Sequence, residues 1–259
     1  MKNFMIFPDA ARFAAAREIL LENHKRYNIG TYQERSQHLI LKCYFEPDQA
    51  RQEIPLDGYI ADIYNDAGVI EIQTSGFGTL RDKLEVFLQR YPVTLVYPSA
   101  LVKRTVWVDP DTGDLNTGKY RTYMCARYAV LSELLYISSF FAHPNLHVLN
   151  FLTVASDYKL LDGYGKERKR RATKTDTVPD DLAEIILLKN KGDIFKMLPF
   201  TAGDIFTSTE LAKMFCMRGR RLWAAVKFLE SIGILCRCGK RGNNILYEAS
   251  ESGDENVVR

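Results

Sequence analysis

The sequence predicts a mixed α/β domain followed by a smaller unit of two helices and a β-hairpin. The chain has 259 residues, which exceeds the ~100–200 residues usual for one domain. Within residues 1–165 the apolar period changes from helical to strand-like and back, which is typical of an α/β fold. Residues 166–179 are basic and lack an apolar face, so we expect a linker there, then a second domain at 180–249 and a polar tail at 250–259.

The composition excludes several classes of protein. Hydrophobic residues make up 46% of the chain and charged residues 26%, which is globular rather than disordered or collagen-like. No apolar run reaches the ~18–20 residues that a membrane helix needs. The first apolar stretch is too short for a signal peptide. We therefore expect a cytoplasmic protein with no membrane partner. The Cys236 and Cys238 pair lacks a second pair and a nearby histidine, so no structural zinc site is expected.

Two helices are expected at the N-terminal end. Apolar residues recur at helical spacing in 9–28, and Gly30 suits the residue after a helix. A second helix is expected at 31–44. Glu34 and His38 are four residues apart in it, and they therefore lie on one face.

A β-hairpin is the next expected element, with strands at 59–64 and 69–74 around the turn sequence Asn-Asp-Ala-Gly. Further elements complete the first domain in the order ααββαββαβ. They are a helix at 80–90, strands at 93–97 and 105–108, a buried helix at 128–141 and a strand at 147–154.

Asp62 and Glu71 are the residues of this hairpin that point most directly to chemistry. With a two-residue loop they fall directly opposite each other, where like charges are destabilising. A divalent cation would compensate that repulsion, and Mg²⁺ or Mn²⁺ prefers oxygen ligands. Gln73 projects from the same face as Glu71, and the carbonyl of Ile72 is a candidate further ligand.

Two other interpretations of this hairpin stay open. A three-residue loop with Gly68 as a bulge would place the two carboxylates on opposite faces. Alternatively, the hairpin is solvated and carries two ordinary acids.

The same residues carry a family resemblance. Ala-Asp-Ile at 61–63, followed by Ile-Glu-Ile-Gln-Thr at 70–74, resembles the core motif of the PD-(D/E)xK nuclease superfamily. The expected element order over residues 31–108 is similar to the αβββαβ core of that superfamily. The resemblance implies a restriction-endonuclease-like mixed sheet flanked by helices. It also implies hydrolysis of DNA phosphodiesters that depends on Mg²⁺ or Mn²⁺, and a homodimer if both strands are cut.

The chain departs from this motif at Gln73, where the family usually has lysine. The resemblance then implies that a basic residue of the following helix, Arg81 or Lys83, supplies the missing charge. It also makes Glu34 the candidate extra acid, with His38 one turn later. A solvated helix face is the alternative for both of these residues.

The C-terminal unit begins with a capping box, in which Thr207 is followed three residues later by Glu210. A second helix is expected at 220–231. We expect Trp223 and Phe228 to lie in its core. Two strands then flank a basic, glycine-rich turn.

This order of helix, turn, helix and hairpin resembles a winged helix-turn-helix domain over residues 193–249. Residues 205–249 contain eight Lys and Arg against three Glu, a local excess that suits contacts with DNA phosphates. The expected contact residues are Arg218, Arg220, Arg221, Lys240 and Arg241. Winged helices that bind other proteins are the alternative.

The sequence therefore predicts a metal-dependent DNA endonuclease. Asp62, Glu71, Gln73, Glu34 and Lys83 are its expected catalytic residues. The competing hypothesis is a DNA-binding regulator whose nuclease-like domain is inactive, and Gln73 favours it. The basic run 166–174 is either a further phosphate contact or a solvated loop.

Overall fold

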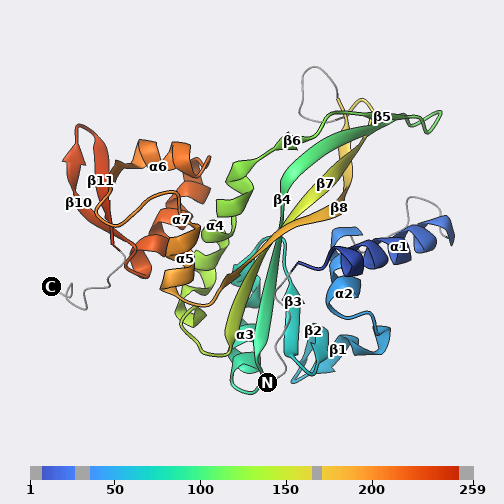
Figure 1. The fold of residues 1–259 in the computed structure, drawn as a ribbon, viewed down its shortest axis with the longest axis horizontal. Coiled ribbons are helices and arrows are strands. Elements are labelled where there is room, and N and C mark those ends of the chain that lie inside the picture. Colours follow the sequence, from blue (N-terminus) through green and yellow to red (C-terminus); the bar gives the residue numbers. More distant parts are fainter. Residues whose placement is uncertain (1–7, 27–35, 165–170, 251–259) are drawn as a thin grey trace. The chain divides into compact units, whose positions relative to one another are not determined.

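The computed structural model describes residues 8–26, 36–164 and 171–250 (Figure 1). It confirms a mixed α/β fold with a large mixed sheet flanked by helices. The sheet has the strand order β1-β2-β3-β4-β7-β8, and β5 and β6 both pair with β4. The chain divides into two compact units. The first consists of residues 1–72, 98–123 and 151–185, and the second of residues 73–97, 124–150 and 186–259.

The first unit begins with two helices and a three-stranded meander. These elements are α1 (Ala10–Arg26), α2 (Ser36–Phe45), the short 3₁₀ turn η1 (Gln49–Arg51), β1 (Gln52–Leu56), β2 (Tyr59–Asn65) and β3 (Gly68–Ile72). Phe151 is fully buried, and the rings of Phe13, Tyr44 and Phe45 lie 5.4–6.3 Å from its ring. This aromatic cluster fixes both helices against the sheet.

The register of the β2–β3 hairpin is the one that a two-residue loop requires. Asn65 pairs with Gly68, and Ile63 pairs with Ile70. The Asn65 side chain accepts the N–H of Ala67 at 2.9 Å, and Gly68 has φ +108°. Local turn chemistry therefore sets the register. Of the two loop lengths that the sequence left open, the structure has the two-residue loop, and the bulged alternative is wrong.

Strand β1 was not expected from the sequence. It is an end strand of the sheet and pairs with β2, with Ile54 opposite Ala61. Pro55 hides it in the sequence, because proline breaks central strands but is tolerated at a sheet edge. Asp57 and Gly58, both with positive φ, form the tight turn between the two strands.

Three long strands pass through both units. They are β4 (Val93–Val108), β7 (Leu146–Leu160) and β8 (Thr173–Leu188). The two strands expected on either side of Pro98 are one continuous strand. A single proline does not end a strand whose residues before and after it remain paired. Two short strands lie along β4, namely β5 (Leu115–Thr117) and β6 (Arg121–Thr122).

Strand β8 corrects the expected linker. Residues 173–179 belong to this strand, which continues through the expected start of the second domain at residue 180. The pattern lacks apolar alternation because polar pairs hold the strand instead. Thr177 Oγ1 donates to Asp157 at 2.8 Å, and Thr175 Oγ1 donates to the carbonyl of Tyr158 at 3.2 Å. The rest of the basic run, 166–170, and the tail from 251 onward lie outside the described residues.

The second unit contains the remaining helices and a small sheet. Its elements before β8 are η2 (Phe77–Leu80), α3 (Arg81–Leu88), η3 (Met124–Tyr128), α4 (Val130–Leu134) and η4 (Leu135–Phe140). Its elements after β8 are α5 (Lys191–Met197), β9 (Ile205–Thr207), α6 (Ser208–Met214), α7 (Gly219–Ser231), β10 (Leu235–Arg241) and β11 (Asn244–Ala249). The buried helix expected at 128–141 is a short α-helix between two 3₁₀ segments, with Ile137 in a non-helical conformation.

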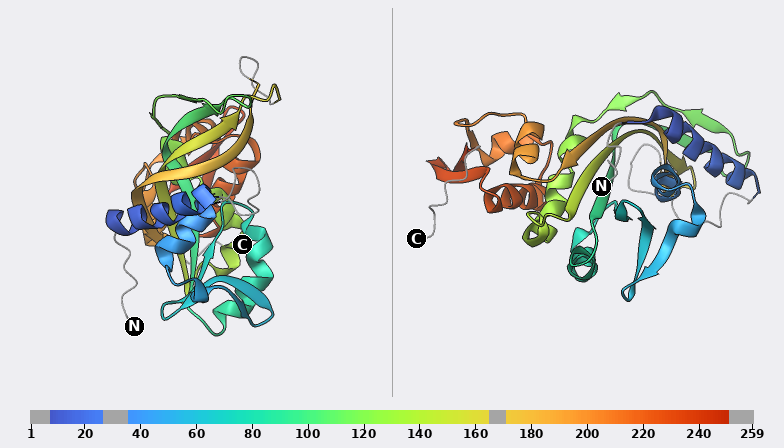
Figure 2. Two further views of the ribbon diagram at one scale, coloured as in Figure 1. Left: turned by 90° about the vertical axis from the view of Figure 1, so that its right-hand side faces the viewer. Right: turned by 60° about the horizontal axis from the view of Figure 1, so that its bottom comes forward.

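Helix α7 packs against α4 and η4 (Figure 2). The rings of Phe141 and Phe228 meet edge to face at 5.3 Å in this contact. The prediction that Phe228 is buried is confirmed, whereas the prediction for Trp223 is wrong because its exposed fraction is 54%. The buried stripe of α7 recurs at Ala224, Ala225 and Phe228, so Trp223 precedes it and turns outward.

The capping box at the start of α6 is confirmed. The backbone N–H of Glu210 donates to Thr207 Oγ1 at 3.2 Å, and the Glu210 carboxylate accepts the N–H of Thr207 at 2.7 Å. Strands β10, β11 and β9 form a three-stranded antiparallel sheet in that order. Within the described residues no helix is long and apolar enough to cross a membrane.

Candidate functional site

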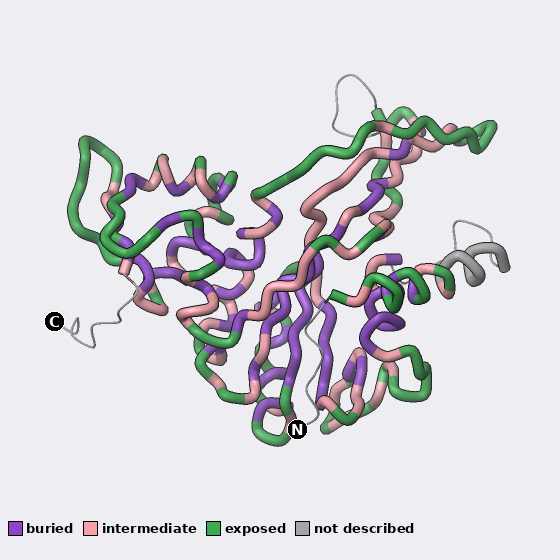
Figure 3. The backbone as a smooth tube through the Cα atoms, viewed as in Figure 1, coloured by how far each residue is buried: buried purple, intermediate pink, exposed green. Residues whose placement is uncertain are grey.

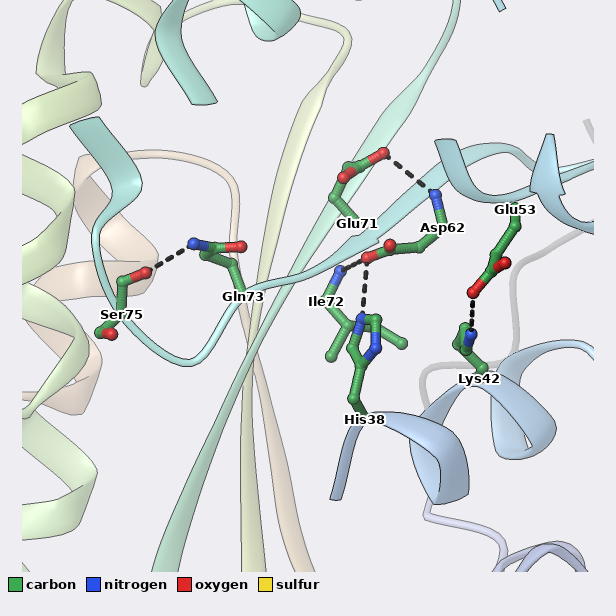
Figure 4. Close-up of polar contacts among 8 residues, drawn as sticks. All are labelled: His38, Lys42, Glu53, Asp62, Glu71, Ile72, Gln73 and Ser75. Carbon is green, nitrogen blue, oxygen red and sulfur yellow. Dashed lines mark hydrogen bonds and ion pairs between the residues drawn. The ribbon is translucent and has the colours of Figure 1, made fainter. Parts of the chain in front are cut away.

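Asp62 and Glu71 lie where the ladder between β2 and β3 ends (Figure 4). Their side chains replace the backbone acceptors that a continued ladder would use. Glu71 Oε1 accepts the backbone N–H of Asp62 at 3.3 Å, and Asp62 Oδ2 accepts the backbone N–H of Ile72 at 2.7 Å. The hairpin therefore places each carboxylate within hydrogen-bonding distance of a backbone N–H on the other strand.

The two acids differ in burial. Glu71 is 3% exposed, in a strand whose five residues are all buried, whereas the side chain of Asp62 keeps 21% of its surface exposed. Burying a carboxylate is costly unless donors or cations surround it. Glu71 is thus the buried member of the pair, and Asp62 is the member that solvent can reach.

Helix α2 contributes His38 to this pair. His38 Nε2 lies 3.1 Å from Asp62 Oδ2, so the carboxylate oxygen is shared between the imidazole and the N–H of Ile72. The expectation that His38 faces the acids therefore agrees with the geometry. Glu34, the other acid expected from this helix, lies outside the described residues.

Lys42 is a residue of this region that the sequence reasoning missed. It follows His38 by four residues on α2 and is only 2% exposed. Its Nζ lies 2.8 Å from Glu53 Oε1, and Glu53 has a left-handed φ of +53°. A lysine between Leu41 and Cys43, in the otherwise apolar run 39–45, was the signal that could have revealed it.

The other expected catalytic residues belong to the second unit. Gln73 Nε2 donates to the carbonyl of Ser75 at 2.6 Å. Arg81 donates to the carbonyl of Tyr136 at 2.8 Å. Lys83 Nζ lies 5.7 Å from the centre of the Phe87 ring on its own helix. Of the five expected catalytic residues, the structure therefore brings Asp62 and Glu71 together within one unit.

The donor set around the two acids is compatible with a hard divalent cation. Mg²⁺ typically takes one or two carboxylates and completes its shell with waters and substrate phosphate, rather than with an all-protein cage. The oxygens of Asp62 and Glu71 and the carbonyl of Ile72 are donors of this type. In the described part of the chain, no group of three or more His, Cys, Asp or Glu residues could hold a metal ion. A cation here would therefore depend on the two carboxylates and on non-protein oxygen.

The expected DNA contacts lie at the surface of the second unit. All five are exposed, and they occur at the start of α7 and at the end of β10: Arg218, Arg220, Arg221, Lys240 and Arg241. The exposed Trp223 lies on the same helix, one turn after Arg220. The ribbon of β10 and β11 ends in a tight turn at Gly242, which has φ +59°.

Comparisons with known proteins place the chain in a family. An uncharacterized protein of Treponema pallidum (strain Nichols) is 29% identical over 230 residues, which covers 87% of this chain and 89% of that protein. No solved structure matches. The family model described as "Domain of unknown function (DUF8091)" matches residues 35–189, which run from α2 to β8 and include both acids. Because this match spans more than half of the chain, the protein belongs to the DUF8091 family.

Proposed function

We propose that this protein is a metal-dependent DNA endonuclease that hydrolyses phosphodiester bonds at the Asp62–Glu71 pair. The observation that carries the proposal is the meeting of two carboxylates at the opened end of the β2–β3 ladder. One acid is buried and the other is partly accessible. Such a pair can bind a cation on one side and face a phosphodiester on the other.

The order of elements around the pair supports this proposal. Helix α2 is followed by β1, β2 and β3, then by α3 and β4. This is the αβββαβ order of the PD-(D/E)xK core. The first three strands form an antiparallel meander, and the acids lie on its second and third strands. The added strand β1 makes the resemblance more complete than the sequence pattern did.

The residues of this site have distinct roles in the proposal. Asp62 and Glu71 would hold Mg²⁺ or Mn²⁺, with the carbonyl of Ile72 as a further ligand. The bound cation would supply a Lewis acid for the attacking water and for the scissile phosphate. His38 acts as a positioning residue, because its contact with Oδ2 fixes the rotamer of Asp62. In this proposal Lys42, the buried cation of the same helix that contacts Glu53, would supply the charge that glutamine at position 73 lacks.

The C-terminal elements support a winged helix-turn-helix as the DNA-positioning module. Their order is α5, β9, α6, α7, β10 and β11, and the last two strands form the wing beside β9. In this proposal α7 lies in the major groove and the basic turn of the wing contacts the backbone. The cluster of exposed arginines at the start of α7 supplies the attraction to phosphate.

A second candidate function is a DNA-binding regulator with an inactive nuclease-like domain. Two observations favour it. Gln73 lacks a charge and is hydrogen-bonded to the carbonyl of Ser75, and both acids already accept backbone N–H groups. In that case the two acids only stabilise the hairpin through these hydrogen bonds, and the function of the protein is the DNA binding of its C-terminal elements.

One experiment separates the two candidates. Supercoiled plasmid is incubated with the full chain and Mg²⁺ or Mn²⁺, and duplex binding is measured in parallel. The endonuclease predicts nicking that Asp62→Asn abolishes while duplex binding stays unchanged. The regulator predicts binding without nicking. One pair of acids cuts one strand, so linear product that appears without a nicked intermediate would indicate a homodimer. Light scattering in the presence of DNA measures that oligomeric state.

A further inference from the structure

A basic and aromatic ribbon lies in the first unit, away from the acid pair in sequence. It consists of residues 99–108 of β4 together with 115–123, which include β5 and β6, and we call it the β4–β6 ribbon. These two segments contain four basic residues and no acid. Figure 3 shows the β5 and β6 side of the ribbon as exposed, and every residue from 119 to 123 is exposed.

Two cations of the ribbon face each other across the strands. Lys103 pairs directly with Arg121, so their side chains lie on one face of the ladder. Like charges in this position are destabilising unless an anion lies between or beside them. Lys103 has Asp157 at 3.5 Å. Arg121 and Lys119 form no hydrogen bond or ion pair with any residue that the structure describes, and both are exposed.

Two tyrosines lie beside these cations on opposite faces of the ladder, with Tyr123 on the face of Lys103 and Arg121 and Tyr120 on the face of Arg104. The exposed fractions of Tyr120 and Tyr123 are 44% and 36%. Arg104 lies 4.6 Å from the centre of the Tyr120 ring, and Lys103 lies 4.7 Å from the centre of the Tyr123 ring. The rings are therefore held at the surface by cation–π contacts rather than buried.

A polar network fixes Tyr120 and Arg104 on the other face of the ladder. The Tyr120 hydroxyl donates to Asp180 at 3.0 Å, and Ser156 Oγ donates to the same carboxylate at 2.6 Å. Arg104 Nε donates to Ser156 Oγ at 2.8 Å. On the face of Arg121, Lys103 contacts Asp157 at 3.5 Å and lies over the Tyr123 ring. Ordering that ring before a ligand arrives lowers the entropy that binding must overcome.

We propose that the β4–β6 ribbon binds a single-stranded segment of DNA. Arg121 and Lys119 contact successive phosphates, and a base stacks on the exposed part of the Tyr123 ring, which lies on the face of Arg121. Charge complementarity selects a polyanion. The exposed Tyr123 ring selects a single strand over a duplex, because the bases of a duplex are already stacked on each other and offer no open face.

This inference extends the proposed function by naming a strand-separated substrate, and it rests on that function only in taking DNA as the substrate. It is tested with the full chain carrying Asp62→Asn, without divalent metal, so that cleavage cannot occur. The probe is a fluorescently labelled oligo-dT, and anisotropy gives its Kd over a series of salt concentrations. A labelled duplex of equal length serves as the second probe.

The variant Arg121→Gln should weaken oligo-dT binding roughly fivefold and reduce the slope of log K against log salt by about 0.7. Its matched control is Arg51→Gln, which removes one exposed arginine of the same unit that already pairs with Asp66. The control should bind oligo-dT as the parent does. Tyr123→Leu should weaken oligo-dT binding at least fivefold, and Tyr123→Phe should not.

Three results would overturn the inference. They are unchanged oligo-dT binding in Arg121→Gln, equal losses in Arg121→Gln and Arg51→Gln, or equal losses on duplex and oligo-dT. Because the readout is binding without metal, absence of nuclease activity leaves this test intact. Circular dichroism of each variant, which should match the parent, checks that these surface substitutions leave the fold unchanged.

Discussion

The backbone N–H of Asp62 donates to Oε1 of Glu71 over 3.3 Å, across the point where β2 and β3 separate. The acid on the third strand therefore satisfies a donor of the second strand, and Asp62 Oδ2 does the same for Ile72. The pair is held together by the backbone as well as by the turn register. This arrangement gives the acids a structural task, which can be measured separately from any catalytic one.

Substitution of Glu71 measures that structural task. Glu71→Ala leaves the N–H of Asp62 without its acceptor and opens a small cavity, so we expect a loss of about 1–3 kcal/mol in the free energy of unfolding. Glu71→Gln keeps the volume and an acceptor oxygen and should cost less. Urea denaturation measures both, and equal stability of the alanine variant and the parent would contradict this role.

Lys42 allows charge and stability to be separated. Lys42→Met keeps the aliphatic stem and removes a buried charge, and the carboxylate of Glu53 that remains is solvated because its side chain is 66% exposed. We therefore expect unchanged or slightly higher stability, together with a large loss of DNA cleavage. The comparison is Glu53→Gln, which leaves the buried ammonium without this carboxylate and should therefore lose stability. Full cleavage by Lys42→Met would remove this residue from the mechanism.

The capping box gives a prediction on stability. Thr207→Ala removes the acceptor for the N–H of Glu210, and loss of such an N-cap costs about 1 kcal/mol. Thermal unfolding of the full chain, followed by the fluorescence of the two tryptophans, measures the change. Thr207→Ser, which keeps the hydroxyl, is the control and should remain close to the parent.

The same box gives a prediction on pH. Hydrogen bonds from the backbone and the side chain of Thr207 hold the pKa of Glu210 below its usual value. A carboxylate with a lowered folded-state pKa stabilises the protein above its unfolded-state pKa. That contribution is lost as pH falls through the lowered value. Glu210→Gln should therefore show a smaller loss of stability than the parent between neutral and acidic pH, and parallel curves would contradict the assignment.

Helix α7 predicts how duplex binding responds to substitution. Arg220→Gln should weaken duplex binding and reduce the salt slope by about 0.9, the value for one lost phosphate contact. Lys227→Gln is the matched control, because Lys227 lies on the same helix and pairs with Glu230 at 2.9 Å. Duplex binding that does not depend on salt would argue against phosphate contacts.

Local signals in the sequence predicted the hairpin and the capping box, because both depend on residues within a few positions of each other, but they left two registers of the hairpin open. Features set by tertiary context were missed. Pro55 concealed the edge strand β1, and the polar residues of β8 concealed that strand. The burial of Lys42 depends on neighbouring elements, so the sequence did not reveal it. Trp223 was misplaced because one position on a helix changes the direction of a side chain by about 100°.

The most direct test of the central claim is the nicking of supercoiled plasmid by the full chain in the presence of Mg²⁺ or Mn²⁺. The parent and Asp62→Asn are prepared side by side, with Asp66→Asn as a control that removes an exposed acid of the same hairpin. We predict nicking by the parent and by Asp66→Asn, no nicking by Asp62→Asn, and loss of all nicking when the metal is chelated. Equal nicking by the parent and by Asp62→Asn, or none by any of the three proteins, would contradict the claim that the Asp62–Glu71 pair cleaves DNA.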